Sequence, residues 1–100
     1  MEAQSRIQEV TTILGESLVV ETITKLAHIE GQKCLRKIDS LKSELARYEK
    51  QFAMSSEEAW SKYQDGVLGD DFDVMEWMAL FQNLMALQGQ YDRITKIELS

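Results

Sequence analysis

The sequence has no proline and contains one cysteine, one histidine and five glycines in 100 residues. Without proline, the residue that interrupts helices most strongly, long unbroken helices are possible. The lone Cys34 excludes an internal disulfide framework and a cysteine zinc site. A chain of this length has room for one domain, residues 1–100, with a thin core.

Long hydrophobic runs are also missing. The opening segment, Met1–Glu9, is polar, so no signal peptide is expected. The longest charge-free segment, Trp77–Tyr91, contains four Asn or Gln residues and is shorter than the roughly 20 apolar residues of a membrane span. We therefore expect a cytoplasmic protein with no membrane contact.

Basic residues are too few for a nucleic-acid-binding protein. Seventeen Asp and Glu against eleven Lys and Arg give a net charge of −6, and residues 1–55 sum to zero. The whole excess therefore lies in residues 56–100, which suit a basic protein surface better than a phosphate backbone. No helix-turn-helix pattern is present, and direct nucleic-acid binding is not expected.

A regular apolar spacing predicts a long helix at about residues 18–54. Apolar side chains recur at alternating intervals of four and three, which is a heptad seam: Cys34, Ile38, Leu41, Leu45, Tyr48 and Phe52. Such a seam needs a second helix packed along it. Gly31 weakens the helix by about 1 kcal/mol relative to Ala, which indicates a bend or a close helix approach.

The N-terminal segment, residues 1–17, is expected to be an arm. β-Branched residues are frequent from Val10 to Thr24, which leaves a strand or hairpin open. A helix or a loosely ordered arm is the favoured interpretation.

Two further helices are predicted after the seam. Ser55 and Glu58 fit a capping box, which opens a short helix at 55–65 with Gly66 as a left-handed stop. Asp70 or Asp71 then caps a last helix at 71–96. Its apolar residues cover more than one face, so both an internal and an external partner are expected.

The predicted fold is therefore all-α. It is a long antiparallel helical hairpin, similar to a coiled coil, with a short connecting helix and an N-terminal arm. Two helices bury a ribbon of side chains rather than a globular core. We therefore expect homodimerisation into a four-helix bundle, or docking on a partner.

The acidic segment invites a calcium-site interpretation, because Asp65 and Glu76 have the spacing of EF-hand ligands. The pattern fails, because Val67 and Gly69 stand where ligands are needed and Asp70 stands where glycine is required. No metal or cofactor is therefore expected.

The sequence does not predict an enzyme. His28 and Cys34 lie six apart on one predicted helix, a spacing at which they do not face each other. Three aromatic residues beside the acidic segment have two possible roles: closing the end of the hairpin, or forming a hot spot for a basic protein. They are Trp60, Tyr63 and Trp77.

Residues 48–77 carry a resemblance to a known family. The segments are YEKQFAMSSEE at 48–58 and DGVLGDDFDVMEW at 65–77. They resemble the pattern YEKKYGMSSEEF…GELGDDxDxxEW of small prokaryotic helical proteins, identified as antitoxins of the TumE/TumA type, and the resemblance covers about residues 40–95. Ala53 replaces the expected glycine, and Ala59 the expected aromatic residue, with Trp60 one position later.

The resemblance implies an antitoxin that occupies a basic toxin. A toxin that acts on RNA needs a basic groove, which an acidic turn could fill as a nucleic-acid mimic. The residues expected to face this partner are Asp65, Asp70, Asp71, Asp73 and Glu76, with Trp60, Tyr63 and Trp77 anchored beneath them. The alternative is a homo-oligomeric helical scaffold whose acidic turn is merely solvated.

Overall fold

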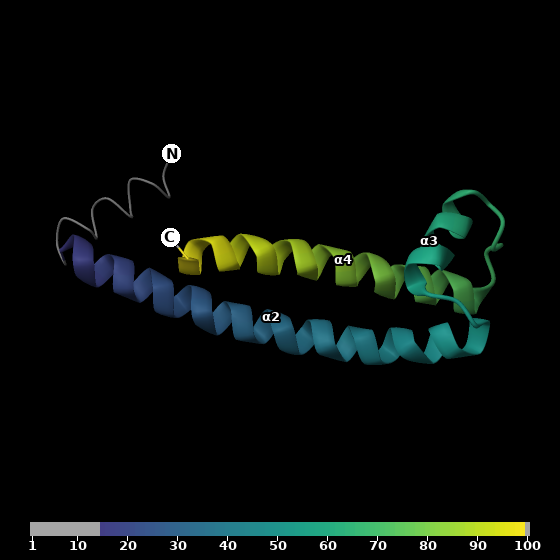
Figure 1. Cartoon of the computed structure of the whole chain (residues 1–100), viewed down its shortest axis with the longest axis horizontal. Helices are drawn as coiled ribbons and strands as arrows, with labels where there is room; N and C mark the ends of the chain where they lie inside the picture. Colours follow the sequence, from purple (N-terminus) through teal and green to yellow (C-terminus); the bar gives the residue numbers. More distant parts are fainter. Residues whose placement is uncertain (1–14, 100) are drawn as a thin grey trace.

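The computed structural model describes residues 15–99 as three helices (Figure 1): α2 (Glu16–Phe52), α3 (Ser56–Gln64) and α4 (Phe72–Leu99). Helices α2 and α4 lie side by side and antiparallel, and α3 lies at the end where the chain turns between them. The protein is elongated, with extents of 57 × 26 × 19 Å. The predicted all-α hairpin with a short connecting helix is confirmed, whereas most of the predicted arm lies outside the described residues.

The start of α2 is helical despite its β-branched residues. The Thr22 hydroxyl donates to the carbonyl of Leu18, and the Thr24 hydroxyl donates to the carbonyl of Val20, both at 2.9 Å. These bonds satisfy the threonine hydroxyls within the helix. The strand that the composition left open is not formed from Glu16 onward.

The predicted seam forms the α2 side of the core. Cys34, Ile38 and Leu45 are buried, and the other three seam residues pack against them. Helix α4 supplies the opposite side with Val74, Trp77, Met78, Phe81 and Leu84. Burying such large side chains stabilises a fold by roughly 1.5–3 kcal/mol each. The core is therefore a narrow layer between two helices.

Gly31 faces α4 at the point where the sequence indicated a bend or a close helix approach. A Cβ atom placed on Gly31 would lie 3.6 Å from Ile94 Cγ2 and 3.7 Å from Tyr91 Cε2. These are ordinary van der Waals distances, so the position accepts a methyl group. The glycine is therefore tolerated here rather than required.

The breadth of the apolar face of α4 is explained in part by α3. Helix α4 contacts α2 along one side and α3 along another. Ala59 of α3 is fully buried, and the Trp60 ring centroid lies 5.9 Å from that of Phe81. At this end of the hairpin, α4 therefore has two internal partners.

The turn from α2 to α3 is closed by groups from both helices. Ala53 adopts a left-handed conformation, with φ of 53°. The Ser55 hydroxyl accepts a hydrogen bond from the Glu58 N–H at 3.1 Å, as the capping box predicts. The Ser56 N–H donates to Glu49 Oε2 at 2.9 Å, so a carboxylate from α2 satisfies a second free donor of α3.

Candidate partner-binding surface

The loop between α3 and α4 places the acidic residues. Gly66 ends α3 with φ of 75°, and the Gly66 and Val67 N–H groups donate back to the carbonyls of Tyr63 and Lys62. This pattern of bonds confirms the predicted left-handed stop. Helix α4 begins at Phe72, which puts Asp71 at its N-cap position.

The five predicted acids fall into two groups. Asp65, Asp70 and Asp71 lie exposed on the loop. Asp73 and Glu76 are also exposed, but they lie on α4 beside the end of α2. Gln51 Nε2 donates to Asp73 Oδ2 at 3.4 Å, so this acid already has a contact within the chain.

Glu76 interacts with Tyr48 of α2. Partial burial raises the pKa of the Tyr48 hydroxyl, and its hydrogen bond to Glu76 raises this pKa further. The negative charges of Glu76 and Asp73 act in the same direction, whereas Arg47 opposes them. Glu76 therefore lies near Tyr48 of α2, and its charge acts on that hydroxyl.

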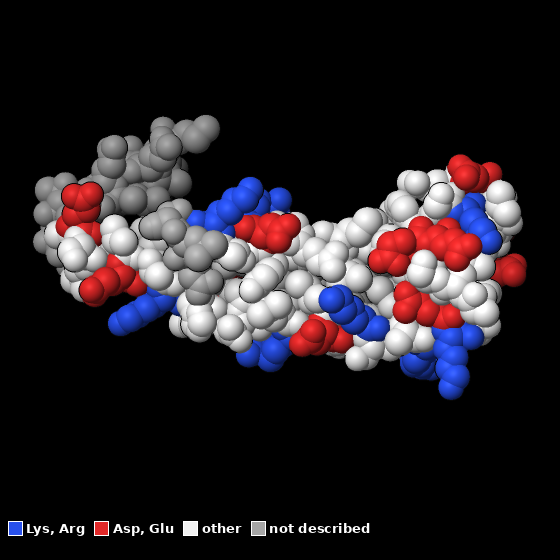
Figure 2. Space-filling model, in the orientation of Figure 1, with Lys and Arg blue, Asp and Glu red and all other residues white. Residues whose placement is uncertain are grey.

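The negative charge at this end is not neutralised locally. Residues 47–77 contain eight acids and three bases. Within residues 15–99, none of the five predicted acids pairs with a lysine or arginine. Figure 2 shows acidic side chains gathered at the α3 end of the molecule. This end therefore projects a negative field that attracts basic surfaces.

Trp77 lies inside the hairpin and has no accessible surface for a partner. Its ring stacks on Phe52 and Tyr48, with centroid distances of 5.0 and 6.0 Å. Its Nε1–H donates to the buried Ser56 hydroxyl at 3.0 Å. Trp77 therefore closes the end of the hairpin, one of the two roles expected for it, and it cannot contact a partner in this conformation.

The other two predicted aromatic residues are half-buried. The Trp60 and Tyr63 rings are 6.3 Å apart on α3. Part of each ring remains accessible, so both residues are available at the surface. The structure thus divides the three aromatics between the core and the surface.

Three apolar residues outside the predicted site are the most exposed at this end. Val67, Phe72 and Met75 expose 71%, 78% and 52% of their surface. Phe72 stands between Asp71 and Asp73, so a large apolar side chain flanked by acids was the signal that could have identified it. We call the set Asp65, Val67, Asp70, Asp71, Phe72 and Met75 the acidic loop end.

Other kinds of site are not evident in the part of the chain that the structure describes. Within residues 15–99, no three His, Cys, Asp or Glu side chains are grouped so that they could hold a metal ion. None of the three helices is both long and apolar enough to cross a membrane. Comparison of the chain with family models, curated proteins and solved structures gave no match.

Proposed function

We propose that this chain is a non-catalytic antitoxin, and that its acidic loop end occupies a basic surface of a partner toxin. The exposure of Phe72 between Asp71 and Asp73 is the observation that carries the proposal. Covering an exposed aromatic side chain with a partner surface removes it from water, which lowers the free energy of the complex. Because the residues around Phe72 are acidic, the partner surface that covers it should be basic.

The two kinds of residue have different roles in this mechanism. The loop aspartates raise the rate of encounter with a basic protein through long-range attraction, which added salt screens. Phe72 and the neighbouring Met75 supply the apolar contact that slows dissociation. A toxin that acts on RNA would thereby have its basic groove filled by a nucleic-acid mimic.

The first experiment is a pull-down of the tagged chain from its native host, with mass spectrometry of the captured proteins. We expect a stoichiometric small basic protein that is released at high salt. Expression of that protein alone should arrest growth, and co-expression of this chain should restore it. Without such growth arrest, the antitoxin role would be wrong.

The acidic loop end is tested by charge reversal. The double variant Asp70→Lys/Asp71→Lys should weaken binding to the captured protein and reduce its salt dependence. A matched control, Asp39→Lys/Glu44→Lys, makes the same change in net charge at exposed positions midway along α2. Equal effects of the two pairs would show that net charge matters and the loop does not.

The apolar contact is tested by Phe72→Ala, with Met85→Ala as the control at an exposed position on α4. Removing a hot-spot side chain costs about 2 kcal/mol or more, so affinity should fall by roughly 30-fold. Because Phe72 is mostly exposed, its removal should leave thermal stability nearly unchanged. Unchanged affinity would contradict the proposed contact.

A further inference from the structure

Within residues 15–99, the hairpin has a second apolar surface that no other helix covers, at its open end opposite α3. Helix α2 continues past the C-terminal end of α4 there (Figure 1). Six large apolar side chains of this region expose between 38% and 57% of their surface: Leu18, Val20, Ile23, Leu26, Ile29 and Ile97. We call these six residues the open-end face.

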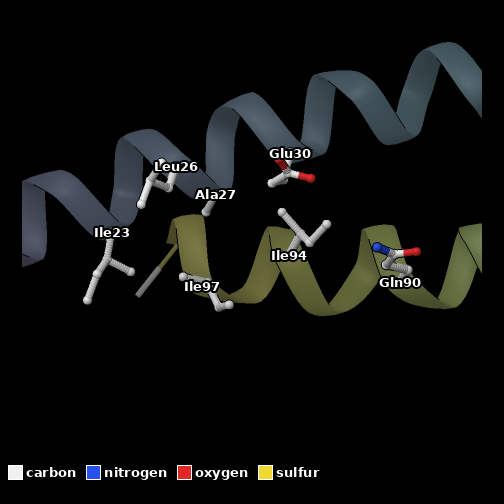
Figure 3. A pocket seen from close by; sticks show the side chains of 7 residues that line it. All are labelled: Ile23, Leu26, Ala27, Glu30, Gln90, Ile94 and Ile97. Carbon is white, nitrogen blue, oxygen red and sulfur yellow. The ribbon is translucent and has the colours of Figure 1, made fainter. Parts of the chain in front are cut away.

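A groove runs into this face between the two long helices (Figure 3). It has a volume of about 350 Å³. Ile23, Leu26 and Ala27 line it from α2, and Ile94 and Ile97 line it from α4. Glu30 and Gln90 complete the lining. The other five residues are aliphatic, so the groove fits apolar side chains of a protein better than a charged ligand.

The apolar residues extend around α2 beyond the side that faces α4. Leu26 and Ile29 lie roughly 100° and 160° around the helix from the buried Ala27, at 100° per residue. A helix that is apolar around most of its circumference is normally covered on more than one side. Helix α4 alone does not cover this part of α2.

We propose that the open-end face binds the same face of a second copy of this chain, in an antiparallel pair. The charge of this region favours that partner. Residues 16–33 and 90–97 together contain four acids and four bases, so two such faces meet without net repulsion. The acidic loop ends would repel each other, and this arrangement places them at opposite extremities.

The exposed area of the chain is large enough for such a pair. The accessible surface is 7466 Å², whereas a compact monomer of 11.5 kDa exposes about 5800 Å². A standard dimer interface buries about 800 Å² per partner. An elongated hairpin thus leaves more surface exposed than a compact monomer does, and the proposed pair would form a four-helix arrangement where the open ends overlap.

The test is the mass of the full chain in solution, measured by light scattering and sedimentation over a range of concentrations. We expect twice the monomer mass of 11.5 kDa. The variant Leu26→Asp/Ile29→Asp should be monomeric, whereas Val67→Asp at the acidic loop end should stay dimeric. A monomer at every concentration up to about 100 μM, as expected if another part of this chain covers the face, would overturn the proposal.

Two further measurements separate loss of the dimer from loss of folding. Far-ultraviolet circular dichroism reports whether the aspartate variant keeps its helices, and Leu26→Ala/Ile29→Ala should weaken dimerisation at least tenfold with less risk to folding. A dimer that neither pair of substitutions weakens would place the interface elsewhere. Because the monomeric variant keeps its acidic loop end, it should still bind the captured toxin, so this proposal and the antitoxin role can fail separately.

Discussion

The hydrogen bond between Trp77 and Ser56 should hold α3 against the long hairpin, and its removal should be measurable. Ser56 is 2% exposed and Trp77 is fully buried. The substitution Ser56→Ala removes the acceptor and leaves the indole N–H inside the protein without a partner. The cost therefore includes the desolvation of that donor, not only one hydrogen bond.

The expected magnitude follows from this burial. A buried donor left unsatisfied costs about 1–3 kcal/mol, and one kcal/mol shifts the melting temperature of a small domain by roughly 4–8 °C. We expect Ser56→Ala to lower the free energy of unfolding by about 2 kcal/mol. The neighbouring Ser55→Ala loses only an exposed helix cap and should cost about 1 kcal/mol.

The assay is a double-mutant cycle read by urea and thermal unfolding. In the Trp77→Phe background the indole N–H is gone, so Ser56→Ala should cost clearly less than in the native chain. Ser55→Ala should cost the same in both backgrounds, because its bond does not involve Trp77. Equal costs of Ser56→Ala in the two backgrounds would refute the argument.

Three other changes have expected outcomes. Ala53→Gly should raise the free energy of unfolding by up to about 1 kcal/mol in thermal unfolding, because Ala53 is held at a positive φ that glycine adopts freely. Gly31→Ala should also stabilise by up to about 1 kcal/mol, since a methyl group fits there; Gly89→Ala in open space is the comparison. Because the pKa of Tyr48 is raised in the native state, the Tyr48 hydroxyl holds its proton above pH 10 more tightly there than in the unfolded chain. Stability should therefore fall as the pH rises beyond that value, and the fall should be smaller in Tyr48→Phe.

The hairpin was predictable because its signals are local and repeat along the chain. The heptad spacing from Cys34 to Phe52 identifies one face of one helix, and that face is the core. The Ser55 cap and the Gly66 stop depend only on residues within one turn of the helix. The hydrogen bond from the Ser56 N–H to Glu49 was not predictable, because Glu49 lies on the preceding helix, across a turn.

The candidate site was harder to predict for a physical reason. Apolar residues of α4 occur around most of the helix, so spacing alone does not separate Trp77, which is buried, from Phe72, which is exposed. The contacts of Trp77 with Tyr48 and Phe52 of α2 and with Ser56 of α3 decide between them, and these are tertiary contacts. The acids were found by composition, but composition could not separate Asp73, which Gln51 contacts, from the loop aspartates.

The two proposed surfaces are far enough apart to act independently. Helix α2 has 37 residues, so it is about 55 Å long, whereas charges in physiological salt are screened over about 8 Å. The field of the acidic loop end therefore does not reach the neutral open-end face. A second copy bound at the open end would leave each acidic loop end accessible, with the other chain's charge far beyond the screening length. Each chain of such a pair would then meet its own basic partner without interference.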